Sequence, residues 1–273
     1  MNIARPGSLP EFVAQATPFL IAHEVEHGLL LGVALATTEP AADAYWSLVL
    51  HHGAVIAAAL RTASILILSC EDAAGAMALV ATDSASPQLR RIVGPPGSIE
   101  RFIAASPQSW SLVMTQGIYE CRAVALPEKV SGVRRVAQPE DRKTLAAWAQ
   151  RLHAEALNEH LAEEDALLRV ANHIAHGAMH VWEDHRRIAS VAAAVAPTPH
   201  GIRINNVYTP PEHRGRGYAG ALVGSLTQAM LESGRDFTFL HTDLSNPTSN
   251  QLYVRLGYRR VAEFRVAQLS GLT

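Results

Sequence analysis

The segment that most constrains the fold is the run of residues 208–222, YTPPEHRGRGYAGAL, which follows a stretch of strand character. Two prolines end the strand, and a glycine-rich loop then leads directly into an amphipathic helix. Glycine lets the backbone approach a ligand, and the first N–H groups of a helix have no partner within it. Together with the helix dipole and the side chains of Arg214 and Arg216, these groups predict a cradle for phosphate or pyrophosphate.

Gly215, Gly217 and Gly220 also satisfy the spacing of the dinucleotide-binding fingerprint. That fingerprint follows its strand directly and has an acidic residue at the end of the next strand. Here two prolines intervene, Asp236 begins the next predicted strand, and only 58 residues follow Gly215. A nicotinamide or flavin site is therefore disfavoured. The competing interpretation is a structural helix start with solvated arginines.

A second segment, residues 243–258 with the sequence DLSNPTSNQLYVRLGY, argues against that structural interpretation. Asn246 precedes a proline that begins a helix, and Gly257 occupies a position that typically ends one. At helical spacing the side chains of Asn246, Asn250 and Tyr253 share one face. The segment therefore predicts a short helix that presents polar and phenolic groups on one side.

Taken together, the two segments resemble the GNAT superfamily of acyl-CoA N-acyltransferases. The resemblance covers residues 132–273, and residues 1–130 fit only loosely, as a degenerate copy. The matching positions are Arg214-x-x-Gly217-x-Ala219 after a strand, followed by Asn246, Leu252-Tyr253 and Leu256-Gly257-Tyr258.

The resemblance implies a role for each matching segment. It implies that the strand ending at Tyr208 diverges from its neighbour and binds the pantetheine arm of acetyl-CoA, and that the loop binds the CoA pyrophosphate. It implies catalytic roles near the thioester for Asn246 and for Tyr253, which would protonate the departing thiolate; the alternative for Tyr253 is an aromatic ring packed under the helix. The implied cofactor-binding residues are Val207, Tyr208, Thr209, Arg214, Gly215, Arg216, Gly217, Tyr218, Ala219, Asn246, Ser249, Asn250 and Tyr253.

No carboxylate lies in residues 203–207, RINNV, where members of the superfamily often have a catalytic glutamate. Glu183, Asp184, His241 and Asp243 are alternative general bases, although each is also compatible with a surface or structural role. Proton removal through water is equally compatible with the sequence.

His173, His176 and His180 are spaced three and four residues apart, a separation compatible with metal ligands on one helical face. Gly177 and a change toward strand character at Val181 argue against one continuous helix. No cysteine or carboxylate cluster completes a site, so we expect no metal and interpret these residues as solvated, core or acceptor-pocket histidines.

Strand-like and helical runs alternate along the chain, which predicts an α/β protein with a mixed sheet flanked by helices. A boundary near residues 127–132 divides it into an N-terminal α/β domain, residues 1–130, and a catalytic GNAT-like domain, residues 131–273. We expect a helix over residues 73–82, and two strands that close the first domain. These two strands are residues 110–115 and 119–125.

Two short segments of the sequence are weakly similar to each other. Residues 92–96, IVGPP, precede a predicted helix in the same way as residues 207–211, VYTPP. Two diverged copies of one domain and a chance similarity of a two-proline loop both explain it.

Charge and cysteine usage exclude several classes of function. Residues 1–130 carry 7 basic and 11 acidic side chains and residues 131–273 carry 16 and 14, so neither half has the concentrated positive charge that nucleic-acid binding requires. The negative first half favours a cationic amine as acceptor. Cys70 and Cys121 permit one disulfide but indicate no framework, and with no signal peptide or bilayer-length apolar run we expect a cytoplasmic protein without membrane contact.

These expectations combine into an N-acetyltransferase that transfers acetyl from acetyl-CoA to a primary amine of a small molecule or peptide. Transfer is expected by direct attack in a ternary complex. The alternatives are an acyltransferase that uses another acyl-CoA, and a non-catalytic CoA-binding sensor or interaction module. The sequence does not indicate an oligomeric state.

Overall fold

The computed structural model describes residues 1–62, 64–70, 75–157 and 160–271. Residues 73 and 74 of the predicted helix lie outside these ranges. The first half contains β1 (Asn2–Ala4), α1 (Leu9–Ile21), α2 (Glu24–Ala36), β2 (Tyr45–His51), β3 (Ala54–Thr62), β4 (Ile65–Cys70), α3 (Ala76–Asp83), β5 (Arg91–Gly94), α4 (Pro96–Ala105) and β6 (Trp110–Cys121).

The second half repeats this order of strands and helices and adds two short 3-10 turns. It contains β7 (Val133–Val136), η1 (Pro139–Asp141), α5 (Arg142–Leu157), α6 (Glu163–Ala175), β8 (Met179–Asp184), β9 (Arg187–Val195), β10 (Gly201–Tyr208), η2 (Pro211–His213), α7 (Tyr218–Glu232), β11 (Phe237–Asp243), α8 (Pro247–Arg255) and β12 (Arg259–Leu269).

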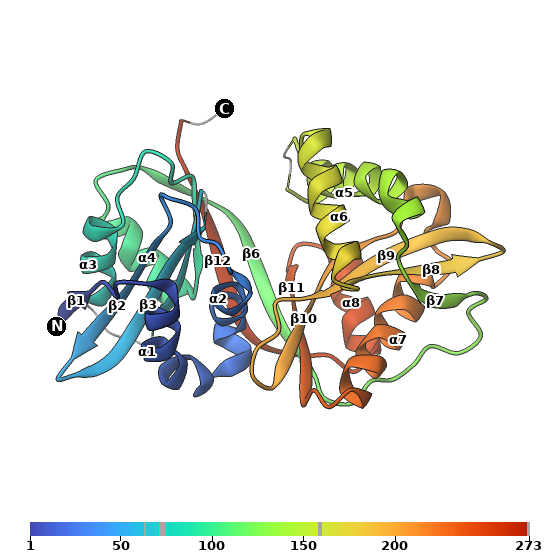
Figure 1. Cartoon of the computed structure of the whole chain (residues 1–273), viewed down its shortest axis with the longest axis horizontal. Helices are drawn as coiled ribbons and strands as arrows, with labels where there is room; N and C mark the ends of the chain where they lie inside the picture. Colours follow the sequence, from blue (N-terminus) through green and yellow to red (C-terminus); the bar gives the residue numbers. More distant parts are fainter. Residues whose placement is uncertain (63, 71–74, 158–159, 272–273) are drawn as a thin grey trace.

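All strands belong to one mixed sheet with the order β1-β2-β3-β4-β5-β12-β6-β11-β10-β9-β8-β7. The last strand of each half is inserted into the other half: β12 lies between β5 and β6, and β6 lies between β11 and β12 (Figure 1). The α/β architecture with a mixed sheet is therefore confirmed. The two halves share their central strands, and the proposed boundary at residue 130 falls in the connection from β6 to β7.

The two halves align by their order of strands and helices, but this alignment does not match residues 92–96 with residues 207–211. Residues 92–96 belong to β5 and the start of α4, whose counterparts in the second half are β11 and α8. Residues 207–211 follow β10, whose counterpart is β4. The weak similarity of the two segments therefore joins positions that are not equivalent, although the internal repeat itself is present.

The predicted closing pair of strands at residues 110–115 and 119–125 is wrong, because β6 is one continuous strand. Gly117 lies inside it. A Cβ atom at this position would come within 2.7 Å of the Tyr119 ring and 2.8 Å of the Leu244 side chain. Glycine is needed there for a close approach within a strand and does not mark a turn.

Helix α2 packs across the junction between the halves. A Cβ atom on Gly28 would lie 2.6 Å from the Phe239 ring, and one on Gly32 would lie 2.5 Å from the carbonyl oxygen of Ala196. At the start of the helix, the carboxylate of Glu24 accepts hydrogen bonds from the backbone N–H of His200 at 2.9 Å and from its ring Nδ1 at 2.5 Å. The two small residues therefore let a helix of the first half dock on strands of the second.

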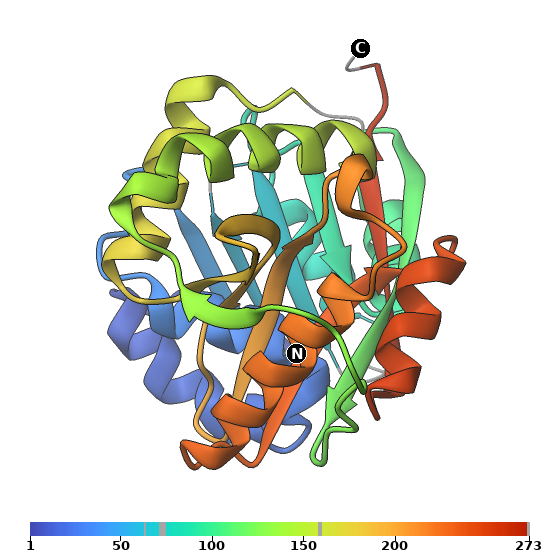
Figure 2. The same cartoon turned by 90° about the vertical axis from the view of Figure 1, so that its right-hand side faces the viewer.

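Helices cover both faces of the second half of the sheet. One face packs against α5 and α6 through residues such as Val181 and Val191, and the opposite face packs against α7 through residues such as Ala192 and Ile204. Figure 2 shows α5 and α7 on the two sides of the strands. Within the described residues, no helix combines the length and apolar character needed to cross a membrane.

Candidate active site

Strands β10 and β11 are parallel neighbours that remain paired over only part of their length. The paired positions are Gly201–Phe237, Ile202–Thr238 and Arg203–Phe239, although β10 continues to Tyr208 and β11 to Asp243. The pairing of β10 with β9 is irregular between Asn205 and Tyr208, where Asn206 has a φ of +52°. Beyond Arg203 the edge of β10 that faces β11 therefore has backbone groups available to a ligand, as the resemblance implied.

The glycine-rich loop connects the end of β10 to α7. Gly215 and Gly217 have φ angles of +76° and +80°, and Gly217 immediately precedes the first residue of the helix. Only glycine adopts these left-handed conformations without strain. A Cβ atom on Gly217 would also lie 3.1 Å from the Val130 side chain. The loop thus brings the free N–H groups of the α7 N-terminus next to the open edge of β10.

Arg214 braces this loop against α5. Its guanidinium donates to the Thr209 carbonyl at 2.9 Å and to the carboxylate of Glu155 at 2.6 Å. The Tyr208 hydroxyl donates to the same carboxylate at 2.7 Å, and this hydrogen bond is the main cause that lowers the pKa of Glu155. Within the described part of the chain Arg216 has no salt-bridge partner, so its charge is not neutralised there.

Tyr218 and Ala219 begin α7. The Tyr218 side chain is buried, and its hydroxyl donates to Asp184 at 2.7 Å, so it anchors the helix to β8. The backbone N–H groups of Tyr218 and Ala219 belong to the first turn of α7, which has no intrahelical acceptors for them, whereas the Tyr218 phenol has a structural contact.

Helix α8 is tied to the ends of two strands. Asn246 is its N-cap, and its side chain accepts a hydrogen bond from the Ser249 N–H at 3.1 Å. The Asn250 side chain donates to the Asp243 carbonyl at 2.9 Å and accepts from the Tyr119 hydroxyl at 2.9 Å. Asn246 and Asn250 therefore fix the position of the helix, whatever further contact they make with a ligand.

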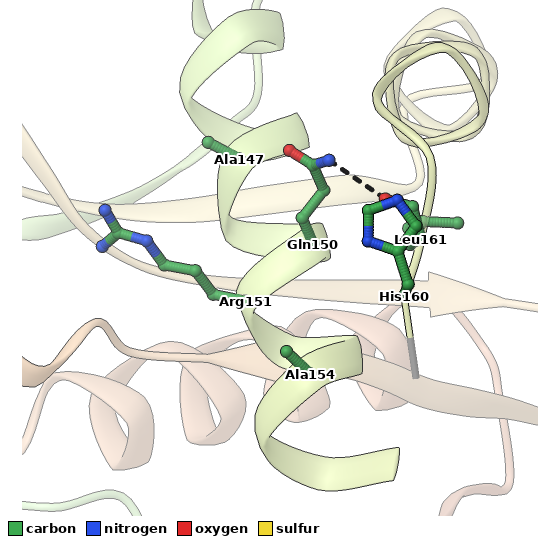
Figure 3. Close-up of a pocket in the computed structure, with 6 residues that line it drawn as sticks. All are labelled: Ala147, Gln150, Arg151, Ala154, His160 and Leu161. Atoms are coloured by element: carbon green, nitrogen blue, oxygen red, sulfur yellow. Dashed lines mark hydrogen bonds between the residues drawn. The ribbon is translucent and has the colours of Figure 1, made fainter. Parts of the chain in front are cut away.

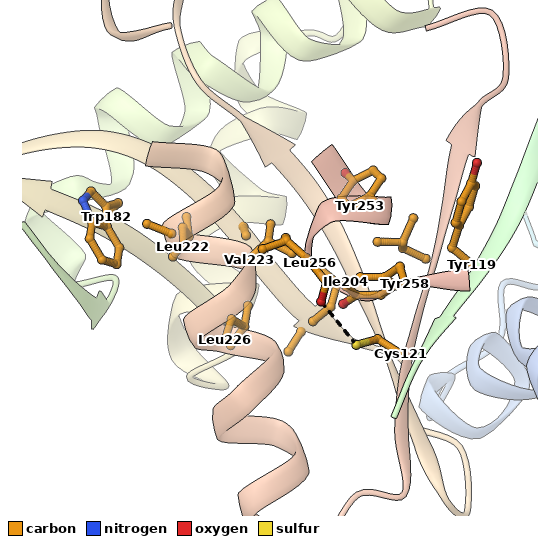
Figure 4. Packing of buried hydrophobic residues seen from close by; sticks show 14 of the residues in the cluster. Tyr119, Cys121, Trp182, Ile204, Leu222, Val223, Leu226, Tyr253, Leu256 and Tyr258 are labelled. Atoms are coloured by element: carbon orange, nitrogen blue, oxygen red, sulfur yellow. Dashed lines mark hydrogen bonds between the residues drawn. The ribbon is translucent and has the colours of Figure 1, made fainter. Parts of the chain in front are cut away.

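Tyr253 lies one turn further along α8 and is 7% exposed. Its ring packs between those of Tyr119 and Tyr258, with centroid distances of 6.5 and 5.8 Å (Figure 4). The Tyr253 hydroxyl forms no hydrogen bond with any residue that the structure describes. Burial raises the pKa of Tyr253 to about 12. The hydroxyl is thus protonated at neutral pH and is not engaged by the protein.

The candidate general bases differ in their environments. Glu183 pairs with Arg135 at 2.6 Å, and Asp184 accepts the bond from Tyr218. Asp243 accepts bonds from the N–H and hydroxyl of Ser245 at the β11–α8 turn. Only His241 has both ring nitrogens buried without a hydrogen-bond partner among the described residues.

His173, His176 and His180 do not share a helical face. His173 lies on α6 and His176 at its C-cap, but His180 belongs to β8. There the Arg134 guanidinium lies 3.0 Å from the His180 Nδ1. No group of three or more His, Cys, Asp or Glu side chains arranged to hold a metal occurs in the described ranges. Cys121 is buried and free, so it forms no disulfide.

A shallow pocket lies on α5, near the loop but outside the opening between β10 and β11. It is lined on the helix by Ala147, Gln150, Arg151 and Ala154, and on the other side by His160 and Leu161 (Figure 3). The Gln150 amide closes one end by donating to the Leu161 carbonyl at 3.0 Å.

Glu155 is not predictable from the sequence. It is one of several charged residues on an amphipathic helix, and its contact with Arg214 joins positions 59 residues apart. The same holds for Tyr119, which reaches the site from the first half of the chain.

Comparison with known proteins shows which fold this chain shares. Residues 183–266 match the family model described as FR47-like protein. No curated protein matches the sequence. Among solved structures, a GCN5-related N-acetyltransferase from Sphaerobacter thermophilus is 15% identical, with 97% of this chain and 95% of that chain covered and a TM-score of 0.65.

Two further solved structures are similar over almost the whole chain. A GNAT-family acetyltransferase from Colwellia psychrerythraea is 10% identical, with 98% and 99% of the two chains covered and a TM-score of 0.62. A tandem GNAT protein from the clavulanic acid biosynthesis pathway is 13% identical, with 100% of each chain covered and a TM-score of 0.59. The resemblance seen in the sequence is thereby confirmed at the level of the fold: the chain has the fold of the GNAT acetyltransferases, in a tandem arrangement of two copies.

Proposed function

We propose that the chain is an N-acetyltransferase that transfers the acetyl group of acetyl-CoA to a primary amine of a small molecule or peptide. The observation that supports this most directly is the divergence of β10 from β11 after the Arg203–Phe239 pair. The open edge leads into the glycine loop and the N-terminus of α7, so one continuous surface offers N–H groups to both a pantetheine arm and a pyrophosphate.

The binding roles follow from this surface. Backbone groups of Val207, Tyr208 and Thr209 bind the pantetheine arm, and the N–H groups from Arg214 to Ala219 bind the pyrophosphate. Arg216 supplies a countercharge, whereas the side chain of Arg214 holds the loop in place through Glu155. Asn246, Ser249, Asn250 and Tyr253 line the end of the site that is close to the thioester.

The chemistry uses few groups of the protein. A neutral amine attacks the thioester carbonyl, and a backbone N–H of β10 stabilises the oxyanion that develops. As the C–N bond forms and the C–S bond breaks, the thiolate takes a proton from the Tyr253 hydroxyl, with Asn246 beside it. The amine loses its proton to water or to a neighbouring base, and the tyrosine is reprotonated from solvent.

The first copy has no equivalent of the loop. Between β4 and α3 the sequence is EDAAG, with a single glycine and no arginine, whereas nine residues with two arginines separate β10 from α7. Acid side chains here would repel a pyrophosphate. We therefore assign one CoA site per chain, in the second copy.

The absence of a carboxylate in residues 203–207 favours a second candidate, a CoA-binding module without turnover. An acyltransferase with another acyl donor is a variant of the first proposal, because the loop contacts only the CoA portion. The distinguishing experiment supplies acetyl-, propionyl-, succinyl- and benzoyl-CoA with a panel of amines and measures free thiol. Thiol release that requires both substrates supports catalysis, whereas binding without release supports the sensor.

Direct transfer predicts that no covalent acetyl-enzyme forms, which mass spectrometry can check. Cys121 is 1% exposed and burial raises the pKa of its thiol, so it is a poor nucleophile. No acetyl adduct is expected after incubation with acetyl-CoA alone. A stoichiometric acetyl-cysteine would contradict direct attack.

A further inference from the structure

Arg203 of β10 has no counter-charge among the residues that the structure describes. Its Nε is buried without a hydrogen-bond partner, and no ion pair or hydrogen bond reaches its guanidinium from the residues that the structure describes. The residue as a whole is half-buried, and a buried N–H donor such as this Nε loses its hydration without compensation when it has no partner. Burial lowers the pKa of Arg203 to about 10, so the side chain is nevertheless charged at neutral pH. The guanidinium charge is therefore not balanced by any described side chain.

Arg203 lies where the open part of the site begins. It is paired with Phe239, at the last position before β10 and β11 diverge. His241 follows Phe239 by two residues and faces the same side of the sheet, with its ring centroid 6.4 Å from that of Phe239. A group bound at Arg203 would therefore be next to the thioester end of the proposed acetyl-CoA site.

Two histidines with unused nitrogens surround this position. Both ring nitrogens of His241 and the Nδ1 of His173, on α6, are buried without a partner. Burial, and then the positive charge of Arg203, lower the pKa of each histidine. The two imidazoles are thus neutral at neutral pH and lie within electrostatic reach of the guanidinium.

Among the described residues, no carboxylate forms an ion pair with Arg203. Glu120 of β6 is opposite Phe239 in the sheet, but it pairs with Arg122 at 2.6 Å. Glu24 of α2, the helix that packs on Phe239, binds His200. On α6 the neighbours of His173 are the basic side chain of Arg169 and the imidazole of His176. The described surroundings therefore leave one positive charge uncompensated.

We propose that Arg203 binds a carboxylate of the acceptor, so that the acceptor is an amino acid or a related amine that carries a carboxylate. This inference rests on the proposed function, because it names the acceptor class of the same site. A guanidinium binds a carboxylate through two parallel N–H···O hydrogen bonds. An ammonium or an imidazole cannot form this bidentate geometry. The bound carboxylate removes the uncompensated charge and places the adjacent amine beside His241.

Charge matching favours a carboxylate over a phosphate. The histidines are neutral, so the cluster carries a single positive charge, which one carboxylate balances and a phosphate dianion exceeds. The neutral ring of His241 accepts a hydrogen bond from the amine of the acceptor. The negative charge of the first half, counted from the sequence, favours a cationic amine as acceptor. The site itself favours a molecule with both an amine and a carboxylate.

The experiment compares acceptors that differ only in this group. Amino acids, their carboxamides, the corresponding decarboxylated amines and aminoalkylphosphonates are offered with saturating acetyl-CoA, and kcat/KM is measured. We expect the amino acids to exceed their carboxamides by about a hundredfold or more, because a site built to bind a charged group rejects the analogue that lacks it. Preference for the phosphonates would assign the site to phosphate, and equal rates for acids and amides would overturn the inference while leaving the acetyltransferase in place.

Two variants give a readout that does not depend on turnover. Arg203→Met removes the half-buried charge with an unbranched apolar side chain, and Arg187→Met removes an exposed charge from neighbouring β9 as the control. With CoA present, amino acids are expected to raise the Tm of the wild type and of Arg187→Met but not of Arg203→Met. Without acceptor, Arg203→Met is expected to be at least as thermostable as the wild type, because a buried N–H donor without a partner has been removed.

These measurements separate the two proposals. If acetyl-CoA binds and amino acids raise the Tm of Arg203→Met as much as that of the wild type, the carboxylate site is wrong and the CoA site stands. A marked loss of stability in Arg203→Met without acceptor would also contradict the inference, because it would show that Arg203 has a partner within the protein. If acetyl-CoA does not bind, the proposed function fails.

Discussion

The hydroxyl of Tyr119 donates a hydrogen bond of 2.9 Å to the side-chain oxygen of Asn250. Tyr119 belongs to β6, the last strand of the first half, whereas Asn250 belongs to α8, the helix that carries Tyr253. The candidate catalytic tyrosine is therefore positioned by a strand from the copy that lacks a CoA loop. This relationship gives the first half a structural role in the site, independent of any activity of its own.

The exchange of β6 and β12 predicts that the second half does not fold alone. A fragment of residues 131–273 leaves β11 and β12 without the strand that joins them and exposes their unpaired edges. We expect it to be insoluble or to lack a cooperative thermal transition. A fragment of residues 108–273, which includes β6, is the matched comparison and should be more soluble. Cooperative unfolding of the shorter fragment, measured by circular dichroism, would show that the strand exchange is dispensable.

Tyr253→Phe is expected to slow turnover without loss of stability. The Tyr253 hydroxyl has no hydrogen bond from the described residues, so its removal breaks no protein contact. Loss of a general acid typically costs about 100-fold or more in kcat, whereas KM for acetyl-CoA should change little. Because burial raises its pKa to about 12, Tyr253 should cause no alkaline loss of activity below pH 10.

Tyr258→Phe is the control for that substitution. The Tyr258 hydroxyl is buried and contacts the hydroxyls of Thr227 and Thr238 at 2.6 and 2.8 Å. Its removal leaves buried groups unsatisfied and should reduce the free energy of unfolding by about 1–3 kcal/mol, with little effect on kcat. Full activity of Tyr253→Phe across the pH range would refute its role in protonating the thiolate.

The pair Glu24 and His200 predicts how pH affects the attachment of α2 to the second half. Hydrogen bonds from Thr198 and His200 outweigh the effect of burial and lower the pKa of Glu24, so its stabilising contribution is present above the unfolded pKa and is lost as pH falls through the lowered value. The hydrogen bond to Glu24 raises the pKa of His200, so its contribution is lost as pH rises through that higher value.

The test is the Tm of the wild type and of Glu24→Gln across the range from pH 3 to pH 9. The difference in Tm should be largest at weakly acidic pH, where Glu24 is ionised and His200 is protonated, and should shrink on either side. A difference that does not vary with pH would mean that the ionic contact does not contribute to stability.

The local features of the site are predictable from the sequence because short patterns specify them. The prolines and glycines around Arg214 define the loop, and Asn246 before a proline defines the start of α8. Non-local pairing is not predictable in this way. The residues near Gly117 do not show that β6 continues through it, because the close approach that requires glycine involves Leu244, far along the chain, as well as Tyr119.

The environment of Arg203 illustrates the same limit. The sequence shows only an arginine in residues 203–207, a stretch without a carboxylate. Its meaning depends on His173 and His241, which reach it from α6 and β11, and on the pairing of Glu120 with Arg122. Charge counts over whole halves of the chain do not detect such an arrangement, because they add surface groups that pair with one another.

Calorimetric titration with acetyl-CoA decides whether the loop around Gly217 binds the cofactor. The wild type should bind acetyl-CoA and CoA with a Kd of roughly micromolar order and should not bind NADH. Gly217→Glu should abolish this binding, because the residue has a φ of +80°, its Cβ would contact Val130 and its charge would repel the phosphates. Gly234→Glu, which has the same left-handed strain at the far end of α7 but open space around it, should bind normally. Absence of acetyl-CoA binding by the wild type, or undiminished binding by Gly217→Glu, would contradict the account.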